Sequence, residues 1–404
     1  MDIKRNIKAA AQLLDIEKLR KHQVNPINAI LNDQDTIVLA RPSAGKSIIY
    51  QIPAVMHRDQ RTIVIEPTLS LMHDQVRKLN DKGIPACAVD STMKRSEQSK
   101  ALKRFINGKV LILYFTPERF VSESFYEILQ AVSLYMVVVD ECHCILDWGY
   151  SFRQDYLRIG EVIEDLPYRP VLAAFTATAA EQDMQEIAEI LHMNNPAIYR
   201  NDLQCSNLTY IKKRTTDRKQ KRKLMYKYLR KYHKNSSVIY CNTHKAVDAV
   251  YEDLKSRFPD EVTRSHAGLS SAKRAKNEQS FLGGDKSIMV ATTAFGMGID
   301  LGTIDLVIHF NMPLSLTDYM QQTGRDGQKA HCVLLYDDED YCINQVILSD
   351  GGSKHACKQL DNMKEFCDDT KHCMSRLLLA HFGQKVKKNC NHCTICQKNR
   401  RNDK

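Results

Sequence analysis

Nine short runs of apolar residues, each uninterrupted and each bounded by turn or helix patterns, constrain the fold of this chain more than any other feature. They are TIVLA (36–40), RTIVIE (61–66), VLILYF (110–115), YMVVVDE (135–141), VLAAFT (171–176), SSVIYC (236–241), SIMVAT (287–292), LVIHF (306–310) and CVLLY (332–336). A half-exposed strand would alternate apolar and polar residues, whereas an uninterrupted run indicates a strand buried on both faces of a parallel sheet. The runs form two series, so the sequence predicts an α/β fold with two parallel sheets in tandem, joined near residues 205–235.

The chain of 404 residues is too long for a single core. We expect three domains, at residues 1–206, 207–350 and 351–404, the last helical, basic and rich in cysteine. No apolar run is long enough to cross a membrane, and residues 1–23 resemble an amphipathic helix rather than a secretory signal. Most of the 13 cysteines are scattered singly. We therefore expect reduced thiols and an intracellular location, which would be the nucleus in a eukaryote.

The net charge of +10 is unevenly distributed along the chain. Residues 212–234 contain 12 lysines and arginines against one aspartate, and residues 354–404 contain 12 against five acids. Such concentrated positive charge indicates a polyanionic partner, most simply nucleic acid. For residues 212–234 the solvated face of a helix is an equally good interpretation.

A phosphate-binding loop follows the first apolar run, in the segment ARPSAGKS (40–47). The segment fits the P-loop pattern except that Ala40 replaces its first glycine. Small residues let backbone N–H groups wrap around phosphates at a helix N-terminus, while the lysine reaches the β- and γ-phosphates and the serine hydroxyl binds Mg²⁺. The residues expected to hold the nucleotide here are Ser43, Ala44, Gly45, Lys46 and Ser47.

Two acids end the fourth apolar run, in the segment DECHCILDWGYSFRQDY (140–156). A P-loop ATPase needs one acid at a strand end for Mg²⁺ and a second that activates the attacking water. Asp140 and Glu141 supply both. The adjacent CHC run (142–144) contains metal-ligand types, but its residues lie too close together to close a tetrahedron, so we interpret it as part of the nucleotide site.

From these motifs onward, nearly the whole chain resembles the RecQ family of superfamily 2 DNA helicases. The segments that carry the resemblance, besides the phosphate loop and DECH (140–143), are LRKHQ (19–23), VIEPTLSLMHDQV (64–76), LYFTPERF (113–120), FTATA (175–179), IYCNTHKAVD (239–248), SHAGLSSAKR (265–274), VATTAFGMGID (290–300) and QQTGRDGQKA (321–330). The resemblance implies two tandem RecA-like domains followed by a small helical zinc-binding domain, with ATP and Mg²⁺ bound between the RecA-like domains.

The resemblance also assigns expected roles to individual residues. Arg20 and Gln23 would recognise adenine, and Thr176 and Thr178 would couple hydrolysis to domain movement. Four further residues complete the implied nucleotide and catalytic set: Gly298, Asp300, Gln321 and Arg325.

The segment LDWGYSFRQDY (146–156) is similar to the aromatic-rich loop of this family. Trp148, Phe152 and Arg153 would then contact single-stranded DNA, because aromatic faces stack on bases and arginine contributes phosphate or cation–π contacts. A buried core tryptophan is the alternative, which the flanking Asp and Gly disfavour. Tyr150 stands where the family usually has histidine.

The C-terminal segment contains cysteines at metal-ligand spacing. One comes from a helix and three follow as CxxCxxC, and the implied ligands are Cys373, Cys390, Cys393 and Cys396. Four thiolates close a structural Zn²⁺ site. An iron–sulfur cluster would suit CxxCxxC as well, but the family resemblance favours zinc. We interpret His372, His392 and Cys367 as non-ligands. The family's winged-helix and helicase-and-RNase-D C-terminal domains are not found in this sequence.

Together these features predict an ATP-dependent 3′→5′ DNA helicase acting on single-stranded and forked duplex DNA in repair and recombination, with unidentified protein partners. The segment QQTGRDGQKA (321–330) departs from the family motif that it resembles. Aligned without a gap, Gln328 occupies the position of the family's arginine finger; with a three-residue gap, a turn of the loop is missing. Such a finger contributes about 10³–10⁵ in rate. The alternative is therefore a hydrolysis-impaired relative that binds DNA and ATP as an annealing or regulatory factor. Smaller departures are Ser43 and Ala44 in place of glycines and Leu301 in place of lysine.

Overall fold

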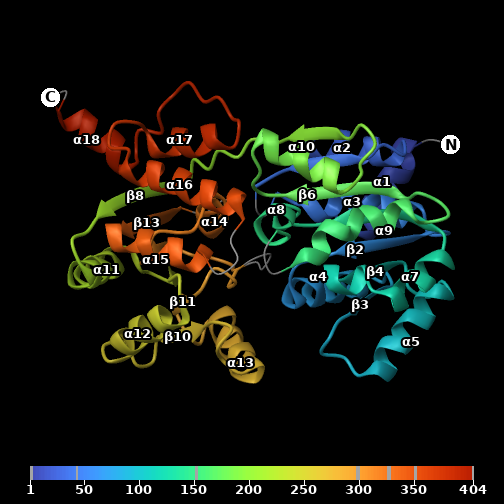
Figure 1. The fold of residues 1–404 in the computed structure, drawn as a ribbon, viewed down its shortest axis with the longest axis horizontal. Coiled ribbons are helices and arrows are strands. Elements are labelled where there is room, and N and C mark those ends of the chain that lie inside the picture. Colours follow the sequence, from blue (N-terminus) through green and yellow to red (C-terminus); the bar gives the residue numbers. More distant parts are fainter. Residues whose placement is uncertain are drawn as a thin grey trace. The chain divides into compact units, whose positions relative to one another are not determined.

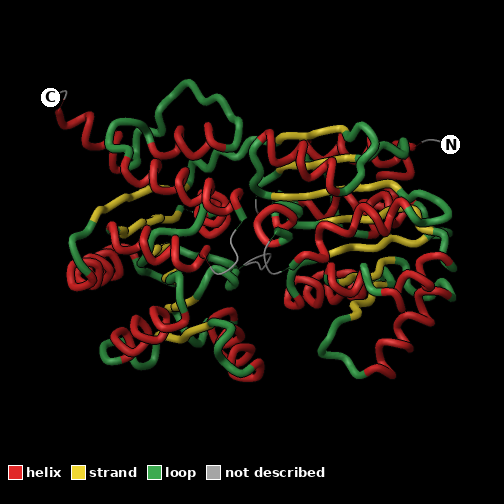
Figure 2. Tube along the Cα trace, in the orientation of Figure 1, coloured by secondary structure: helices red, strands yellow, loops and turns green. Residues whose placement is uncertain are grey.

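The computed structural model describes residues 3–41, 44–150, 153–296, 301–324, 329–349 and 353–402, with the side chains of the last two left out. The chain divides into two compact units, Met1–Asp202 and Leu203–Lys404 (Figure 1). Each unit contains one parallel sheet covered by helices, as Figure 2 shows. Within the described residues, no helix combines the length and the apolar character that crossing a membrane would require.

The first unit contains a seven-stranded sheet in the order β3-β4-β2-β5-β6-β1-β7. Its strands are β1 (Thr36–Leu39), β2 (Arg61–Ile65), β3 (Ala86–Val89), β4 (Ile112–Phe115), β5 (Leu134–Val139), β6 (Val171–Thr176) and β7 (Ala197–Arg200). Every neighbouring pair is parallel. All five strands predicted for this half are present, because their continuous apolar sequence fits a sheet covered on both faces.

Helices connect these strands and form the rest of the first core. They are α1 (Ile3–Leu13), α2 (Lys21–Leu31), α3 (Lys46–Met56), α4 (Leu69–Asp81), α5 (Arg95–Ile106), α6 (Pro117–Phe120), α7 (Glu123–Gln130), α8 (Cys144–Trp148), the 3₁₀ helix η1 (Gln154–Arg158), α9 (Ile159–Glu164) and α10 (Glu181–Ile190). Leu14, Ile27 and Ile49 pack with the inner side chains of β1 and β6 in one buried cluster. The N-terminal helices are therefore part of the fold that supports the phosphate loop.

The second unit contains a six-stranded parallel sheet in the order β10-β11-β9-β12-β13-β8. Its strands are β8 (Leu208–Arg214), β9 (Ser237–Tyr240), β10 (Val262–Ser265), β11 (Ile288–Ala291), β12 (Leu306–His309) and β13 (Ala330–Tyr336). The helices of this unit are α11 (Arg218–Tyr232), α12 (His244–Lys255), α13 (Ser271–Leu282), α14 (Leu316–Thr323), α15 (Asp338–Ser349), α16 (Lys354–Asp368), α17 (Met374–His381) and α18 (Thr394–Asn402). The predicted fold class, two tandem parallel-sheet units followed by helices, is confirmed.

The segment that we expected to join the two sheets, residues 205–235, is instead an integral part of the second unit. It forms edge strand β8 and helix α11, and the apolar side of α11, including Met225 and Leu229, packs in the second core. Alternation of buried and exposed residues along β8 concealed this strand from a search for continuous apolar runs. The predicted third domain, residues 351–404, falls within the second compact unit, and its boundary stays a prediction.

Two lysines of the basic run 212–234 are buried for structural reasons. The Lys221 ammonium lies 2.7 Å from Asp340 and 2.8 Å from Asp337, at the start of α15. Lys212 donates to the carbonyl oxygens of Phe366 and Asp369 at the end of α16. The run is therefore partly an internal support and partly an exposed helix face, rather than a single surface for a polyanion.

Candidate active site

The phosphate loop begins after β1 and ends where α3 starts. Gly45 adopts φ +77°, and a Cβ at this residue would lie 2.7 Å from the Gln23 amide nitrogen. Both the left-handed backbone and the close approach require glycine here. Ala44 is buried, and Lys46 and Ser47 form the first residues of α3, where the backbone N–H groups of a helix N-terminus can bind an anion. Ser43 lies outside the described residues.

Lys46 lies against the two acids that follow β5. Its ammonium group donates to Glu141 Oε1 at 3.1 Å and lies 4.0 Å from Asp140 Oδ1. Burial works against the charge of Lys46, but attraction from Glu141 and Asp140 outweighs it, and the pKa of Lys46 is raised. Burial likewise opposes ionisation of Glu141, but the Lys46 ammonium group lowers its pKa overall. Burial raises the pKa of Asp140 to about 6. The sequence therefore predicted residues that the structure brings together.

The two acids connect to the strand end of β6 through His143. Glu141, with φ +46°, donates its backbone N–H to Asp140 Oδ1 at 2.8 Å. His143 Nδ1 lies 3.0 Å from Thr176 Oγ1, and the Thr176 hydroxyl donates to the Thr178 carbonyl oxygen at 3.0 Å. Burial lowers the pKa of His143 to about 4, so the imidazole is neutral. Because His143 Nδ1 also lies 3.5 Å from Glu141 Oε2, contacts run from the two acids to the predicted coupling residues. The sequence placed His143 in the CHC run at the nucleotide site but gave it no role of its own.

The expected adenine-recognition residues also contact the phosphate loop. The buried Gln23 side chain donates to the Gly45 carbonyl oxygen at 3.0 Å and accepts from the Arg20 backbone N–H at 2.8 Å. His22 lies 3.0 Å from the Ala44 carbonyl oxygen. The start of α2 therefore supports the loop, and adenine recognition by Arg20 and Gln23 stays a prediction.

A third acid, Glu66, lies beside Asp140 and Glu141 and was not singled out from the sequence. It follows β2, and its side chain is 0% exposed. Burial first, and then the charges of Asp140 and Glu141, raise the pKa of Glu66 well above its usual range. The signal available in the sequence was an acid directly after a buried strand, as with Asp140 after β5.

The aromatic-rich loop is connected to a neighbouring motif through Arg153. Its guanidinium forms a two-point contact with Glu118 of α6, at 2.5 Å and 3.0 Å, and donates to the Pro67 carbonyl oxygen at 2.8 Å. The same group lies 5.5 Å from the centre of the Trp148 ring. The half-buried Trp148 therefore packs against a cation. Phe152 lies outside the described residues, and contact of this loop with DNA stays a prediction.

In the second unit, most residues of the predicted nucleotide set fall outside the described part of the chain. These residues are Gly298, Asp300 and Arg325. Gln328, which stands where the family has an arginine, also lies outside the described residues. Gln321 is half-buried on α14. Leu301 is buried.

The four expected metal ligands converge. The sulfur atoms of Cys373, Cys390, Cys393 and Cys396 all lie within 4.8 Å of one another. The Cys390 and Cys396 sulfurs are 4.0 Å apart, and ligands at about 2.3 Å in a tetrahedron are separated by about 3.8 Å. Backbone N–H groups of Cys390 and Cys393 donate to the sulfurs of Cys373 and Cys390. The cluster therefore fits Zn²⁺ with four thiolates.

The nearby residues that we interpreted as non-ligands have other contacts. His392 Nε2 lies 2.9 Å from the Leu208 carbonyl oxygen, and His372 Nδ1 lies 2.6 Å from Asp369 Oδ2. Cys367 is buried on α16, and its backbone carbonyl oxygen accepts from the Tyr336 hydroxyl. The His392 contact also joins the cysteine segment to β8, a strand that the sequence did not predict. Figure 1 shows α18 close to β8.

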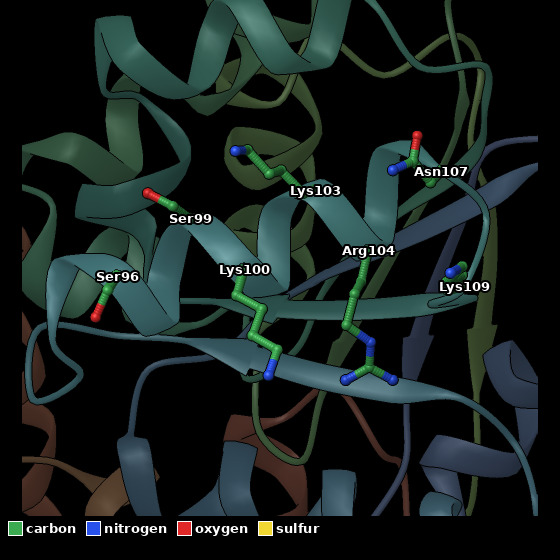
Figure 3. A pocket seen from close by; sticks show the side chains of 7 residues that line it. All are labelled: Ser96, Ser99, Lys100, Lys103, Arg104, Asn107 and Lys109. Atoms are coloured by element: carbon green, nitrogen blue, oxygen red, sulfur yellow. The ribbon is translucent and has the colours of Figure 1, made fainter.

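A basic hollow on α5 is a further feature that the sequence argument missed. It has a volume of about 340 Å³ and is lined by Ser96, Ser99, Lys100, Lys103, Arg104, Asn107 and Lys109. Figure 3 shows Lys100 and Arg104, one helical turn apart, extending to the same side of the helix. Across the ranges that the structure describes, none of its four cations forms an ion pair. Phosphate groups are the ligands that suit such a surface.

Three family profiles match the chain. The DEAD/DEAH box helicase profile matches residues 20–187, the helicase conserved C-terminal domain profile matches residues 220–329, and the RecQ zinc-binding profile matches residues 321–397. The first covers the phosphate loop and both acids, and the last covers all four clustered cysteines.

Among curated proteins, the chain is 34% identical over 396 residues to the ATP-dependent DNA helicase RecQ of Bacillus subtilis, covering 96% of this chain and 66% of that protein. It is 31% identical over 341 residues to the probable ATP-dependent DNA helicase RecS of the same organism, covering 83% and 68%. The chain spans 60% to 66% of the length of three bacterial RecQ relatives. A similar fold occurs in Saccharomyces cerevisiae Dbp5 bound to RNA and ADP BeF3, with a TM-score of 0.69 and 17% identity over 90% of this chain and 97% of that one.

Proposed function

The chain belongs to the RecQ family, and we propose that it is an ATP-dependent DNA helicase that moves 3′→5′ along single-stranded DNA. The observation that carries the proposal is the contact of Lys46 with Asp140 and Glu141 at the end of the phosphate loop. These are the three side chains that nucleotide hydrolysis at a P-loop requires. Curated relatives named as DNA helicases support DNA as the polymer.

In the proposed reaction, water attacks the γ-phosphorus of ATP and the bond to the ADP oxygen breaks. The Glu141 carboxylate accepts the proton of the attacking water, which its lowered pKa permits because the group is ionised at neutral pH. The Lys46 ammonium turns from Glu141 toward the β- and γ-phosphates. His143 and Thr176 transmit the state of the acids to the segment after β6.

The residues that would hold Mg²⁺ are Ser47, at the start of α3, and Asp140. Hydroxyl and carboxylate oxygens are the ligands that this cation prefers, and when bound it neutralises charge that develops on the phosphates. Asp140 is 6% exposed, and the Lys46 ammonium group, at 4.0 Å, lies nearer to Glu141 than to Asp140. The Asp140 carboxyl therefore fits a further cation.

Single-stranded and forked DNA are the proposed partners. Trp148 and Arg153 would contact the strand, and the hollow on α5 is a second surface whose charge suits nucleic acid. In this proposal Arg153 exchanges its contact with Glu118 for a DNA phosphate, and the loop thereby signals occupancy of the DNA site. The four-cysteine cluster would hold Zn²⁺ as a structural element of the second unit.

The second candidate function is a hydrolysis-impaired relative that binds or anneals DNA or regulates other proteins. The observation that favours it is Gln328 at the position of the family's arginine finger. A neutral amide cannot replace the positive charge that a finger places on the transferring phosphate, and Arg325 would then have to do so.

An ATPase assay with and without single-stranded DNA separates these functions, using the wild type, Glu141→Gln and Gln328→Arg. A helicase shows hydrolysis that DNA stimulates and that Glu141→Gln abolishes. Slow wild-type hydrolysis that Gln328→Arg raises by about 10³ or more identifies the impaired relative. If DNA did not stimulate hydrolysis and Glu141→Gln left the rate unchanged, both proposed functions of this site would be ruled out.

A further inference from the structure

Glu66 is fixed by the sheet beside Asp140. Its backbone N–H donates to the Phe115 carbonyl oxygen of β4 at 2.8 Å, and the preceding Ile65 accepts from the Asp140 backbone N–H at 3.0 Å. The two acids therefore follow neighbouring parallel strands, β2 and β5, at the same edge of the sheet. The Glu66 carboxyl lies against that of Asp140 and is 0% exposed.

Among the described residues, the Glu66 carboxyl has no hydrogen-bond partner apart from the neighbouring Asp140 carboxyl. The nearest cation, Lys46, contacts Glu141 instead. Burying an unpaired carboxylate costs several kcal/mol, so native structures rarely retain one without a partner. A side chain that served only packing would be apolar at this position, as its neighbours in β2 are.

Three acids, Glu66, Asp140 and Glu141, gather at this edge of the sheet around one ammonium group, that of Lys46. A divalent cation supplies positive charge that this group of carboxyls lacks among the described residues. Mg²⁺ retains several of its waters in proteins and is held by one or two carboxylates, directly or through those waters.

We propose that Glu66 acts with Asp140 in holding the hydrated divalent cation of the nucleotide site. The proposal rests on the proposed function, because it uses the same cation. It adds a residue from the segment VIEPT (64–68) to the two that the phosphate loop and the DECH segment supply. Carboxylates that hold a cation through its waters typically contribute 10- to 100-fold to its affinity.

The test is a titration of Mn²⁺, a paramagnetic substitute for Mg²⁺, followed by electron paramagnetic resonance on the full chain with ADP present. The variants are Glu66→Gln, which keeps the shape and removes the charge, and Asp318→Asn. Asp318 is a matched control because it is a partly buried acid of the second unit whose pKa is also raised by burial. We expect Glu66→Gln to weaken Mn²⁺ binding by about 10-fold or more and Asp318→Asn to leave it unchanged.

The outcomes separate this inference from the proposed function. If the wild type binds no Mn²⁺ with ADP, the proposed function fails. If the wild type binds and Glu66→Gln binds equally well, only the role of Glu66 is overturned. Thermal unfolding without added Mn²⁺ or chelator checks the fold, with Glu66→Ser as a second variant. Loss of folding in both variants would assign Glu66 a structural role and overturn the inference as well.

Discussion

The Lys46 ammonium group lies 3.1 Å from Glu141 and thereby joins the end of the phosphate loop to the acids after β5. The side chains are only 10% and 13% exposed. The two groups therefore stabilise each other's charge, and whatever binds at the loop must compete with this contact or take it over. Several consequences for stability and activity can be measured.

Replacing Lys46 with Met removes the only cation in contact with Asp140 and Glu141 among the described residues. Breaking a buried ion pair by deleting one partner costs about 3–5 kcal/mol. We expect a lower free energy of unfolding in urea, by an amount near the lower end of that range because the acids can take up protons. We also expect loss of binding of a fluorescent ATP analogue. Lys8→Met, at an exposed lysine of α1, is the control and should change neither quantity.

Replacing Glu141 with Gln keeps a hydrogen-bond acceptor for Lys46 but removes the proton acceptor. We expect DNA-stimulated hydrolysis to fall by about 10²–10⁴, the usual contribution of a general base. Affinity for ATP should be retained, because the lysine is released to the phosphates. Equilibrium nucleotide binding and steady-state phosphate release measure the two quantities separately. Parallel loss of both would show that Glu141 holds the site together rather than acting on water.

Replacing Trp148 with Ala should weaken binding of a fluorescent single-stranded oligonucleotide. Loss of one base–aromatic stack costs about 1–3 kcal/mol, which corresponds to about 5- to 150-fold in affinity. The Arg153 guanidinium, which lies over this ring, should also become more mobile. Tyr168→Ala, at an 80% exposed aromatic in the same unit, is the matched control. Equal affinity of the Trp148 variant and the wild type would contradict the assignment of this loop to DNA.

Replacing Cys393 with Ser should remove bound zinc. The free energy of binding of structural zinc is about 10–16 kcal/mol in small domains, so its loss should unfold the C-terminal segment. Metal analysis and limited proteolysis measure the two effects. Cys367→Ser is the control, because this buried cysteine lies outside the four-sulfur cluster. If the Cys393 variant retained zinc and the Cys367 variant lost it, Cys367 rather than Cys393 would be the zinc ligand.

Asp318 predicts a pH dependence of stability. Burial raises its pKa from 3.8 to about 6, so the folded chain binds this proton more tightly than the unfolded chain does. The resulting stabilisation is complete below about pH 4 and is lost as the pH rises through 6. Since the group is partly exposed, we expect about 1–2 kcal/mol. Urea unfolding at pH 5 and pH 7.5 should show a smaller difference in Asp318→Asn than in the wild type. The same difference between the two pH values in the variant and the wild type would contradict the raised pKa of Asp318.

The sequence by itself determined those features whose signal is local. Continuous apolar runs predicted nine strands, the small residues around Gly45 predicted the loop before α3, and acids at a strand end predicted Asp140 and Glu141. Each of these depends on neighbours within a few residues, where backbone geometry and burial leave a direct pattern. Strands β3, β7, β8 and β10 are the four edge strands of the two sheets, and the last three contain polar residues among their apolar ones.

Only the tertiary structure decided which distant residues meet. Parallel strands are joined by long crossovers, so the order of strands in the sheet, and hence the neighbour of each strand end, is not written in local sequence. For this reason Glu66 beside Asp140, Arg153 against Glu118, and the buried Lys212 and Lys221 emerged only from the fold. The charges were visible in the sequence, but whether a charge is solvated, paired or isolated depends on what the fold places next to it.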